Sequence, residues 1–438
     1  MKANPNKNTI INIVTLGCSK NLVDSERLAS QLESNGIKIL HNSDSPKART
    51  VVINTCGFIE SAKKESIDTI LGFVHAKDKG LIDKIYVIGC LSERYKSELE
   101  KEITEVDSYF GVNSLEEIVA SLGLQYKSQL LNERKTGTPE HYSYLKISEG
   151  CDRTCSFCAI PLIRGKHESR TIESLVSEAE FLAKRNVKEL ILIAQDLSYY
   201  GRDLYGGAKL PELIDELSKV NGIEWIRLHY AYPTAFPEKV VYQFKSISKL
   251  CRYIDIPFQH SSDAILKMMR RNSTAESTRQ FIEHLRNEVP EIAIRTTLMV
   301  GHPGETEKEF ENLAEFVRWA RFDRLGIFTY SHEDDTYAAK HYKDDIPESV
   351  KKSRADYIMN IQSGISLELN QQKIGKQFRI IVDGREGDNF LGRTEFDSPE
   401  VDNEVFIKDC KKELEPGAFV NVEITGASEY DLEAKIIS

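Results

Sequence analysis

Apolar and polar residues alternate in a strand-then-helix order through the first third of the chain. Residues with helical spacing begin at Asp24, at about Ser61 and at about Ser92. Each helix follows a short apolar run that predicts a buried strand, and these runs are 11–16, 51–54 and 84–89. Strands that alternate with helices predict a parallel, doubly wound sheet, whose ligands collect at the carboxyl ends of its strands.

Six further apolar runs predict a second set of strand–helix units in the middle of the chain. The expected strands are 144–147, 189–194, 225–229, 254–256, 292–300 and 325–328. Helical spacing appears between them at 174–185, 210–219, 281–287 and 307–320. This repeat predicts a partial (β/α) barrel, with functional groups at the C-terminal ends of its strands.

From residue 371 the helical period disappears and short alternating strands follow. They are expected at 378–382, 390–394, 404–407 and 419–424. This pattern predicts a small antiparallel β-barrel. A polar stretch at 128–141, which contains Gly137, Thr138 and Pro139, indicates a linker. The sequence therefore predicts an α/β multidomain chain, and the expected domains are 8–125, 137–368 and 371–438.

Composition narrows the class of protein. The 438 residues contain no apolar run long enough to span a bilayer and begin without a secretory h-region, so a cytoplasmic location is expected. Eight cysteines in such a chain indicate metal or catalytic roles rather than disulfides. The net charge of −10 argues against a broad surface for polyanions, but not against a local basic groove.

The terminal barrel is acidic. From residue 371 onward nine basic residues stand against fifteen acidic ones, a net charge of −6. Because nucleic-acid affinity depends mainly on neutralising phosphates, this barrel suits a basic protein partner better than RNA. A merely solvated surface is an equally good interpretation, since a charge count ignores clustering.

Three cysteines within eight residues, Cys151, Cys155 and Cys158, form the densest chemical signal in the chain. Three thiolates can hold three irons of a four-iron cluster, and no fourth cysteine follows until Cys251. One iron would then lack a protein ligand and could bind a small molecule. Structural zinc is the alternative, but it needs four ligands, and His167 is the one nearby candidate for the fourth.

Three more cysteines share one structural place. Cys18, Cys56 and Cys90 each fall at the carboxyl end of a predicted strand, beside a glycine that would let the backbone approach a bulky ligand. A single cysteine at such a position is more often a buried core residue. Three at one sheet edge predict a second cluster held by three thiolates.

Polar residues also end several strands of the predicted barrel. They are Gln195-Asp196, His229-Tyr230, 259–262 and 301–306. Each could equally be a cap or a turn. Local basic residues of this domain are Arg164, Lys166, Arg170, Arg270, Arg271 and Arg295. The pair Arg270-Arg271 is either a solvated helix end or a contact to carboxylates or phosphate.

The spacing of Cys151, Cys155 and Cys158 resembles the Cys-x3-Cys-x2-Cys motif of the radical S-adenosylmethionine (SAM) superfamily. With the upstream cysteines and the terminal barrel, the whole chain resembles the methylthiotransferases of that superfamily, and among them the branch that modifies the twelfth small-subunit ribosomal protein. Ser19 replaces a common proline and Ser398 a frequent alanine, and neither is a cluster ligand. The stretches that carry the resemblance are 16–26, 54–59, 149–152, 163–166 and 392–402.

The resemblance implies an N-terminal cluster domain, a radical SAM barrel, a terminal TRAM barrel and two [4Fe-4S] clusters. The cluster on the 151–158 motif would chelate SAM at its open iron, and reduction would give a 5′-deoxyadenosyl radical that takes hydrogen from the β-carbon of an aspartate. The cluster on the three upstream cysteines would carry or donate the sulfur, and a further SAM would supply the methyl group. An electron donor such as flavodoxin or ferredoxin is also implied. The expected SAM contacts are Phe157, Gln195, His229, Arg295 and Gly301.

Two other functions fit the same cysteines. The first is methylthiolation of an adenosine in tRNA, against which the acidic terminal barrel counts. The tRNA-modifying relatives usually show Cys-Gln-Met-Asn where this chain has Cys-Ser-Lys-Asn at 18–21. The second is a two-cluster electron carrier without SAM chemistry.

Overall fold

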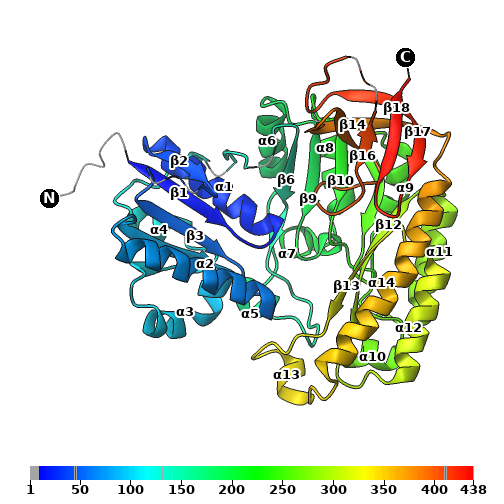
Figure 1. The fold of residues 1–438 in the computed structure, drawn as a ribbon, viewed down its shortest axis with the longest axis horizontal. Helices are drawn as coiled ribbons and strands as arrows, with labels where there is room; N and C mark the ends of the chain where they lie inside the picture. Colours follow the sequence, from blue (N-terminus) through cyan, green and yellow to red (C-terminus); the bar gives the residue numbers. More distant parts are fainter. Residues whose placement is uncertain are drawn as a thin grey trace. The chain divides into compact units, whose positions relative to one another are not determined.

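The computed structural model describes residues 9–437 apart from 44, 46, 131, 138, 409 and 411 (Figure 1). The described chain forms two compact units. The first comprises 9–137, 149–153 and 159–168, and the second comprises 139–148, 154–158 and 169–437. The expected domain start at residue 8 and Thr138 of the expected linker lie outside the described residues. Within the described ranges, none of the helices combines the length and hydrophobicity that a membrane crossing requires.

The first unit is built on a five-stranded parallel sheet with the order β2-β1-β3-β4-β5. Its strands are β1 (Ile10–Thr15), β2 (Lys38–His41), β3 (Thr50–Thr55), β4 (Lys84–Gly89) and β5 (Ser108–Tyr109). Its helices are α1 (Ser19–Ser34), α2 (Glu60–Asp78), α3 (Cys90–Glu102), α4 (Leu115–Ser121), η1 (Ser128–Leu130) and α5 (Ile160–Arg164). The order reverses between β1 and β3, so these two strands flank the topological switch point.

Apolar side chains cover both faces of this sheet. On one face Ile13 of β1 packs in a cluster with Leu28 of α1 and Val119 of α4. On the other face Ile53 of β3 packs in a cluster with Ile70 of α2 and with residues of α3. Helices on both faces of a parallel sheet confirm the predicted doubly wound architecture.

The second unit contains a six-stranded parallel sheet with the order β13-β12-β11-β10-β9-β6. Its strands are β6 (Tyr142–Lys146), β9 (Glu189–Ile193), β10 (Trp225–Leu228), β11 (Leu250–Asp255), β12 (Ala293–Val300) and β13 (Arg324–Thr329). The longer helices are α6 (Ile172–Ala183), α8 (Leu210–Ser218), α9 (Glu238–Ser246), α11 (Ala275–Glu288), α12 (Glu307–Ala320) and α14 (Glu348–Gln371). Shorter elements of this unit are η2 (Leu197–Tyr199), α7 (Arg202–Tyr205), α10 (Asp263–Met268) and α13 (Tyr337–His341). The short strands β7 (Ser148–Glu149) and β8 (Glu168–Ser169) each contain the residues at which the assignment changes from one unit to the other.

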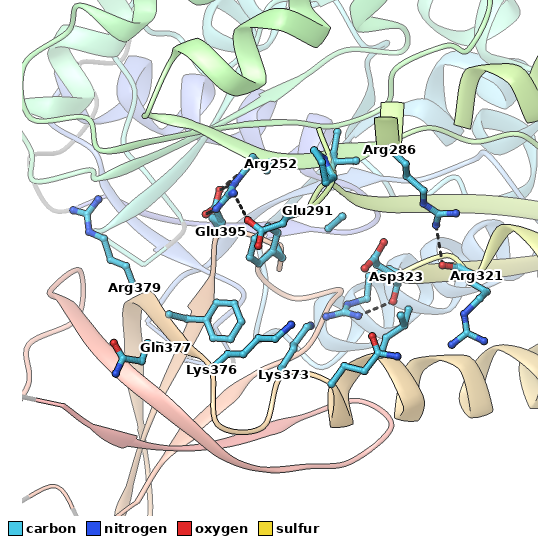
Figure 2. Close-up of a pocket in the computed structure, with 18 residues that line it drawn as sticks. Arg252, Arg286, Glu291, Arg321, Asp323, Lys373, Lys376, Gln377, Arg379 and Glu395 are labelled. Carbon is cyan, nitrogen blue, oxygen red and sulfur yellow. Dashed lines mark hydrogen bonds and ion pairs between the residues drawn. The ribbon is translucent and has the colours of Figure 1, made fainter. Parts of the chain in front are cut away.

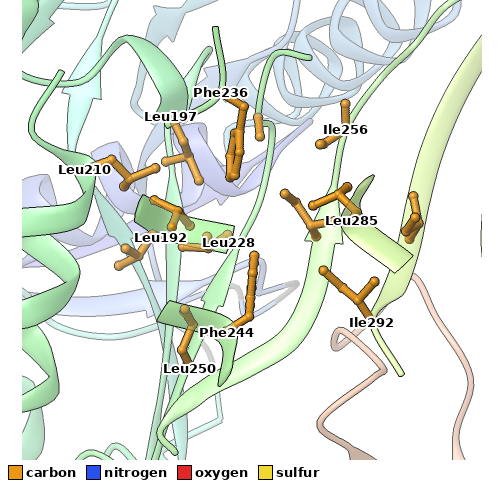
Figure 3. Packing of buried hydrophobic residues seen from close by; sticks show 14 of the residues in the cluster. Leu192, Leu197, Leu210, Leu228, Phe236, Phe244, Leu250, Ile256, Leu285 and Ile292 are labelled. Atoms are coloured by element: carbon orange, nitrogen blue, oxygen red, sulfur yellow. The ribbon is translucent and has the colours of Figure 1, made fainter. Parts of the chain in front are cut away.

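Side chains of this sheet alternate between two environments, because successive residues of a strand point to opposite faces. Leu192 and Leu228 belong to the apolar core shared with Phe244 of α9 and Leu285 of α11 (Figure 3). Residues of the other parity are largely polar or aromatic, and we call the side of the sheet that they occupy the lumen face. They include Tyr142, Tyr144, Arg227, Tyr253, Asp255 and Arg295. The open, all-parallel sheet confirms the predicted partial barrel.

The C-terminal strands close into a five-stranded barrel with the order β14-β15-β16-β18-β17. They are β14 (Gln377–Glu386), β15 (Asn389–Thr394), β16 (Val405–Ile407), β17 (Phe419–Ala427) and β18 (Leu432–Ile436). Four of the pairings are antiparallel and the β16–β18 pairing is parallel. The predicted barrel is confirmed, and β18 is the strand that the sequence analysis did not predict.

The loop between β15 and β16, residues 395–404, covers part of the lumen face, and we call it the insertion loop. The backbone O of Glu395 accepts a hydrogen bond from Nη1 of Arg227 at 2.7 Å. The hydroxyl of Tyr253 donates to Oδ2 of Asp402 at 2.8 Å. The hydroxyl of Tyr142 donates to Oε1 of Glu400 at 2.9 Å. The insertion loop thereby joins the terminal barrel to three strands of the parallel sheet.

Candidate functional site

The three upstream cysteines lie at the carboxyl edge of the first sheet. Cys18 directly precedes α1, Cys56 follows β3, and Cys90 is the first residue of α3. Cys18 is exposed and the other two are buried. Cys18 and Cys56 follow the strands that flank the switch point, where open α/β sheets bind their ligands. All three occupy the strand-to-helix turns that the sequence predicts, while their role as ligands stays a prediction.

Glycines let these turns approach one another. Gly17 has a φ of +88°, and a Cβ there would lie 2.7 Å from Cβ of Cys56. Gly89 has a φ of +99°, and a Cβ there would lie 2.4 Å from Oδ1 of Asn54. Both positions require glycine, because side chains rarely adopt such φ values and real Cβ contacts are longer. These two glycines make room for neighbouring strand ends, and their role in admitting a bulky ligand stays a prediction.

One guanidinium, that of Arg164 at the end of α5, connects the parts of this site. Its Nη2 donates to Oδ1 of Asn21 at 2.6 Å and to Sγ of Cys90 at 3.4 Å. Its Nη1 donates to Oδ2 of Asp24 at 3.1 Å and to both carboxylate oxygens of Glu149 at 3.0 Å. Arg164 is buried. It therefore joins a cysteine, the start of α1 and the segment before the cysteine-rich loop in one polar network.

Asn21 holds the ends of β1 and β3 together beneath this network. Its Nδ2 donates to the backbone O of Leu16 at 2.9 Å and to that of Thr55 at 3.0 Å. Its own backbone O accepts from Nδ2 of Asn54 at 2.8 Å. Sequence analysis assigned no role to Asn21 or to Arg164, although both lie in stretches that carry the family resemblance. The family resemblance of stretches 16–26 and 163–166 could have indicated that Asn21 and Arg164 are functional.

Burial dominates the electrostatics of the cysteines. It raises the pKa of the Cys56 thiol, and it raises the pKa of Cys90 to about 12 although Arg164 opposes the shift. The charges of Cys18 and Cys56 also raise the pKa of Cys90, so the three sulfurs lie within electrostatic range of one another. Burial alone would lower the pKa of Arg164, but the surrounding negative charges, with Asp24 first among them, raise it above its ordinary value. Thiolates here need added positive charge, which a bound metal would supply.

The donor set fits an iron–sulfur cluster better than a single metal ion. Across the described residues, no three His, Cys, Asp or Glu side chains lie close enough to share one ion. Structural zinc requires four ligands on the same ion, whereas the thiolates of a four-iron cluster bind different irons. The zinc interpretation therefore gains no support from the geometry.

The first part of the cysteine-rich loop packs within the first unit. The backbone N of Cys151 donates to O of Gly165 at 3.1 Å. The backbone N of His167 donates to Oδ1 of Asp152 at 3.0 Å. These bonds close the base of the loop and orient the segment that carries its first cysteine.

The second part of the loop, residues 154–158, packs within the second unit. The backbone N of Ser156 donates to O of Met269 at 2.9 Å. Nη1 of Arg271 lies 3.7 Å from Sγ of Cys155, and its guanidinium covers the ring of Tyr232 at 4.1 Å. Arg271, which sequence analysis left between a solvated helix end and an anion contact, is therefore buried against a cysteine sulfur. Each set of three cysteines thus has one guanidinium against a sulfur.

Two of the expected SAM contacts meet the insertion loop. Nε2 of His229 lies 2.8 Å from Oγ of Ser398. Arg295 forms ion pairs of 3.3 Å with Asp255 and with Asp402. Both side chains therefore lie on the lumen face, and their contact with SAM stays a prediction.

The other three expected SAM contacts lie elsewhere in the second unit. Gln195 is half-buried two residues beyond β9, and Phe157 is half-buried in the cysteine-rich loop. Gly301 follows β12 and donates its N–H to Oε2 of Glu305 at 3.0 Å. A Cβ on Gly301 would lie 2.3 Å from Cγ of Lys351, so this tight turn also requires glycine. Their assignment stays a prediction as well.

Three family matches divide the chain. Residues 10–111 match the uncharacterized protein family UPF0004, residues 145–317 match the radical SAM superfamily, and residues 374–437 match the TRAM domain. The ribosomal protein uS12 methylthiotransferase RimO of Flavobacterium johnsoniae is 56% identical over 433 residues, which cover 99% of this chain and 99% of that protein. The RimO proteins of Phocaeicola vulgatus and Cytophaga hutchinsonii are 54% and 53% identical, covering 98% and 100% of this chain and 100% of each relative.

Solved structures share the fold at much lower identity. The radical S-adenosylmethionine methyltransferase TsrM of Kitasatospora setae, with cobalamin and a [4Fe-4S] cluster bound, matches with a TM-score of 0.56 and 14% identity. The match covers 76% of this chain and 77% of TsrM. The cobalamin-dependent enzyme OxsB matches with a TM-score of 0.51 and 12% identity, covering 80% of this chain and 56% of OxsB. These likenesses support the fold.

Proposed function

Because the chain belongs to the RimO family of ribosomal protein uS12 methylthiotransferases, we propose that it places a methylthio group on the β-carbon of an aspartate in uS12. The chain is a radical SAM methylthiotransferase that acts on this small-subunit ribosomal protein. The choice of the aspartate and of its β-carbon is the part that we propose. It agrees with the acidic terminal barrel, which suits a basic protein substrate.

We propose two [4Fe-4S] clusters for this reaction. Cys151, Cys155 and Cys158 would hold the cluster that binds SAM, and the three upstream cysteines would hold the other. When bound, the clusters and SAM supply the radical and the methylthio group, because such chemistry belongs to the cofactors. The position of three cysteines at the carboxyl edge of the first sheet carries this proposal, since an enzyme that only cleaves SAM has no use for a second set.

The chain itself supplies positive charge and position. Arg164 contacts Sγ of Cys90, and Arg271 contacts Sγ of Cys155, so each would offset the negative charge of thiolates in a poorly solvated site. Hydrogen bonds of Asn21 fix the strand ends that bear two of the upstream cysteines. Fixed groups of this kind cost little reorganisation during a reaction.

Binding of SAM is proposed for residues of the second unit. The adenine would pack near Phe157, and the remaining contacts would come from Gln195, His229, Arg295 and Gly301. The insertion loop fills part of the lumen face beside His229 and Arg295. It would limit the access of water to a reactive intermediate.

The proposal includes a cytoplasmic location and an electron donor such as flavodoxin or ferredoxin. One-electron reduction requires an external donor, because none of the proposed residues is itself a reductant. A location beside the small ribosomal subunit follows from the substrate.

The test is an anaerobic assay of the reconstituted chain with uS12 and with tRNA as alternative substrates. We expect about eight irons per chain, 5′-deoxyadenosine on reduction with dithionite, and a mass gain on uS12 that corresponds to one methylthio group. Modification of tRNA alone would make the protein-substrate assignment wrong. Absence of 5′-deoxyadenosine would favour the electron carrier.

Two cysteine variants separate the proposed roles. Cys155→Ala should abolish SAM cleavage, because it removes a ligand of the SAM-binding cluster. Cys56→Ala should still cleave SAM but form no methylthio product. If Cys56→Ala made methylthio product at the normal rate, the role of the upstream cysteines would be wrong.

A further inference from the structure

A basic pocket of about 670 Å³ lies in the second unit, where the first residues of β12 and β13 meet the end of α14 and the start of β14 (Figure 2). Seven basic and three acidic side chains line it, in a chain whose net charge is −10. The pocket lies at the N-terminal ends of the strands, and the cysteine-rich loop follows β6 at the opposite ends. The proposed methylthiotransfer reaction therefore leaves this pocket without a role.

Four of the seven basic side chains already have carboxylate partners. Arg324 pairs with Asp397 in the insertion loop. The other three pairs are Arg252 with Glu395 at 2.6 Å, Arg321 with Glu368 at 2.7 Å and Arg379 with Glu224 at 2.9 Å. These pairs neutralise four of the lining cations, and Glu395 is the one of these four partners that itself lines the pocket.

The remaining three cations, Arg286, Lys373 and Lys376, have no carboxylate within ion-pair distance among the described residues. Nη2 of Arg286 donates to the backbone O of Arg321 at 3.0 Å. Nζ of Lys373 donates to Oδ1 of Asn370 at 3.2 Å. Lys376 is exposed, and its Nζ has no hydrogen-bond or ion-pair partner in the part of the chain that the structure describes. Glu291 and Glu395 of the lining pair with Arg252, and Asp323 is a third acidic side chain there, so the three cations exceed the remaining negative charge of the pocket. An excess of positive charge favours an anionic ligand.

The electrostatics of Lys373 agree with this geometry. Burial is the main cause that lowers its pKa; the charges of Asp397 and Asp323 oppose this shift, and those of Arg324 and Lys376 add to it. Burial also lowers the pKa of Arg286. A bound anion would remove the mutual repulsion of these cations and stabilise their charged forms.

We propose that this pocket binds the phosphate group of a nucleotide, with Lys373 and Lys376 as its ligands (Figure 2). Two charged amines, each with several donor hydrogens, match the multiple oxygens and the charge of a phosphate better than the two oxygens of a carboxylate. The volume suits a small organic ligand and is far larger than inorganic phosphate needs. Phe378 also lines the pocket and is half-buried, so its ring offers a stacking surface for a base.

The nucleotide could be free or part of an RNA strand, and one experiment distinguishes these sources. The full-length holoenzyme, with its SAM site saturated, is titrated with uridine 5′-monophosphate, with uridine, and with a single-stranded RNA of about ten nucleotides. A pyrimidine probe avoids competition with the adenine of SAM. Calorimetry measures the small ligands, and fluorescence anisotropy measures the labelled RNA at two salt concentrations.

The variant for this test is Lys376→Gln, because Lys376 is exposed and its loss should not disturb folding. Its matched control is Lys352→Gln, an exposed lysine of α14 outside the pocket. We expect the phosphate probe to bind more tightly than uridine, and Lys376→Gln to weaken that binding about tenfold, as for one charged hydrogen bond. Lys352→Gln should bind like the wild type.

Each outcome decides the proposal. Binding of uridine 5′-monophosphate assigns the pocket to a free nucleotide, and binding of RNA alone assigns it to a strand; sensitivity to Lys376→Gln is required in both cases. The proposal is wrong if neither phosphate probe binds better than uridine, or if Lys376→Gln binds as tightly as Lys352→Gln. Neither result depends on methylthiotransfer, so the pocket and the proposed function can fail separately.

Discussion

At the scale of single residues, a buried guanidinium accompanies each set of cysteines. Arg164 touches Sγ of Cys90 while it also binds Asn21, from which it is separated by 143 positions in the chain. A positive charge beside a cluster stabilises its reduced, more negative state. If the upstream cysteines hold a cluster as proposed, the charge of Arg164 should tune the reduction potential of that cluster as well as help to position it.

Replacing Arg164 by Gln should shift the reduction potential of the upstream cluster to more negative values, because the reduced state loses a nearby positive charge. Arg164→Lys should shift the potential less than Arg164→Gln does, because Lys keeps a positive charge. Spectroscopically monitored redox titration of the reconstituted chain provides the measurement, and Arg49→Gln, which removes an exposed pair with Asp83 in the same unit, is the control. An unchanged potential in Arg164→Gln would show that Arg164 has only a structural role.

His302 is a buried histidine whose charge state links pH to stability. Its Nδ1 lies 2.9 Å from O of Pro303, and its ring packs 5.3 Å from the ring of Tyr330. Burial lowers its pKa from 6.5 to about 4. Between these pH values the unfolded chain takes up a proton that the folded chain does not, so stability falls as the pH drops through this window.

His302→Gln should remove part of this pH dependence. The wild type should lose about 2 kcal/mol through His302 between neutral pH and about pH 5, and the variant should lack that loss. Urea unfolding at the two pH values measures the difference. Equal pH dependence in both proteins would mean that the pKa of His302 is the same in the folded and unfolded chains.

At this scale the sequence predicted the place of the cysteines after the strands, but not the residues that surround them. The cysteines stand out by spacing and by their place after predicted strands. The partners of Arg164 do not, because Asn21, Asp24 and Glu149 meet it only after the chain has folded. Contacts between positions so far apart leave no local pattern to detect.

At the scale of elements, the turns that carry the upstream cysteines depend on glycine. Gly89 has a φ of +99° and faces Asn54 and the backbone of Thr55, whereas Gly36 has a φ of +83° and open space around it. Alanine substitutions at Gly36 and Gly89 can therefore be compared: both add the strain of a left-handed backbone, and only the second also adds a steric clash.

Gly36→Ala should cost about 1 kcal/mol, because it adds left-handed strain alone. Gly89→Ala should cost roughly 2–3 kcal/mol more, because a Cβ there forces the strand ends apart. Thermal unfolding of the two variants measures both effects. Equal destabilisation would contradict the close packing of these turns.

Elements with strong periodicity were predicted and short ones were not. The buried strands β1, β3 and β4 match the apolar runs to within one residue. Helix α1 begins at Ser19 rather than at the expected Asp24, because Cys18 is still extended and the helix starts directly after it. The edge strands β2 and β5 have four and two residues, too few for an alternating pattern to be distinctive.

At the scale of the whole molecule, buried ion pairs join the terminal barrel to the parallel sheet. Arg393 of β15 lies 2.9 Å from Glu189, which also pairs with Arg227 at 2.6 Å. Burial raises the pKa of Glu189, but the two arginines outweigh it and the pKa lies below its usual value. A second contact between the same parts, Arg379 with Glu224, is exposed.

Arg393→Met should destabilise the chain by roughly 3–5 kcal/mol, because it removes one of the two cations that compensate the fully buried carboxylate of Glu189. Arg379→Met should cost less than about 1 kcal/mol, because water replaces the lost partner. Chemical denaturation of both variants tests this difference. Similar costs would indicate that the buried pair is accessible to solvent.

Counting charges along the chain overestimated the free acidity of the terminal barrel. Asp397 is paired with Arg324, and Asp402 with Arg295, so part of the net charge of −6 is neutralised inside the second unit. The barrel architecture was predictable from alternation and turns. The contact of the barrel with the parallel sheet was not predictable, because the insertion loop has no hydrophobic period that indicates which surface it packs on.

The insertion loop also sets an order of events during synthesis. The strands β6 to β13 are synthesised before residues 395–404. The charged groups of Glu189 and Arg227 therefore stay without their contacts to Arg393 and Glu395 until the last part of the chain is made. A nascent chain at that stage has the main apolar core of the parallel sheet but lacks the partners of its buried charged groups. Premature termination before β15 would therefore yield a product that cellular quality control can distinguish from the finished protein.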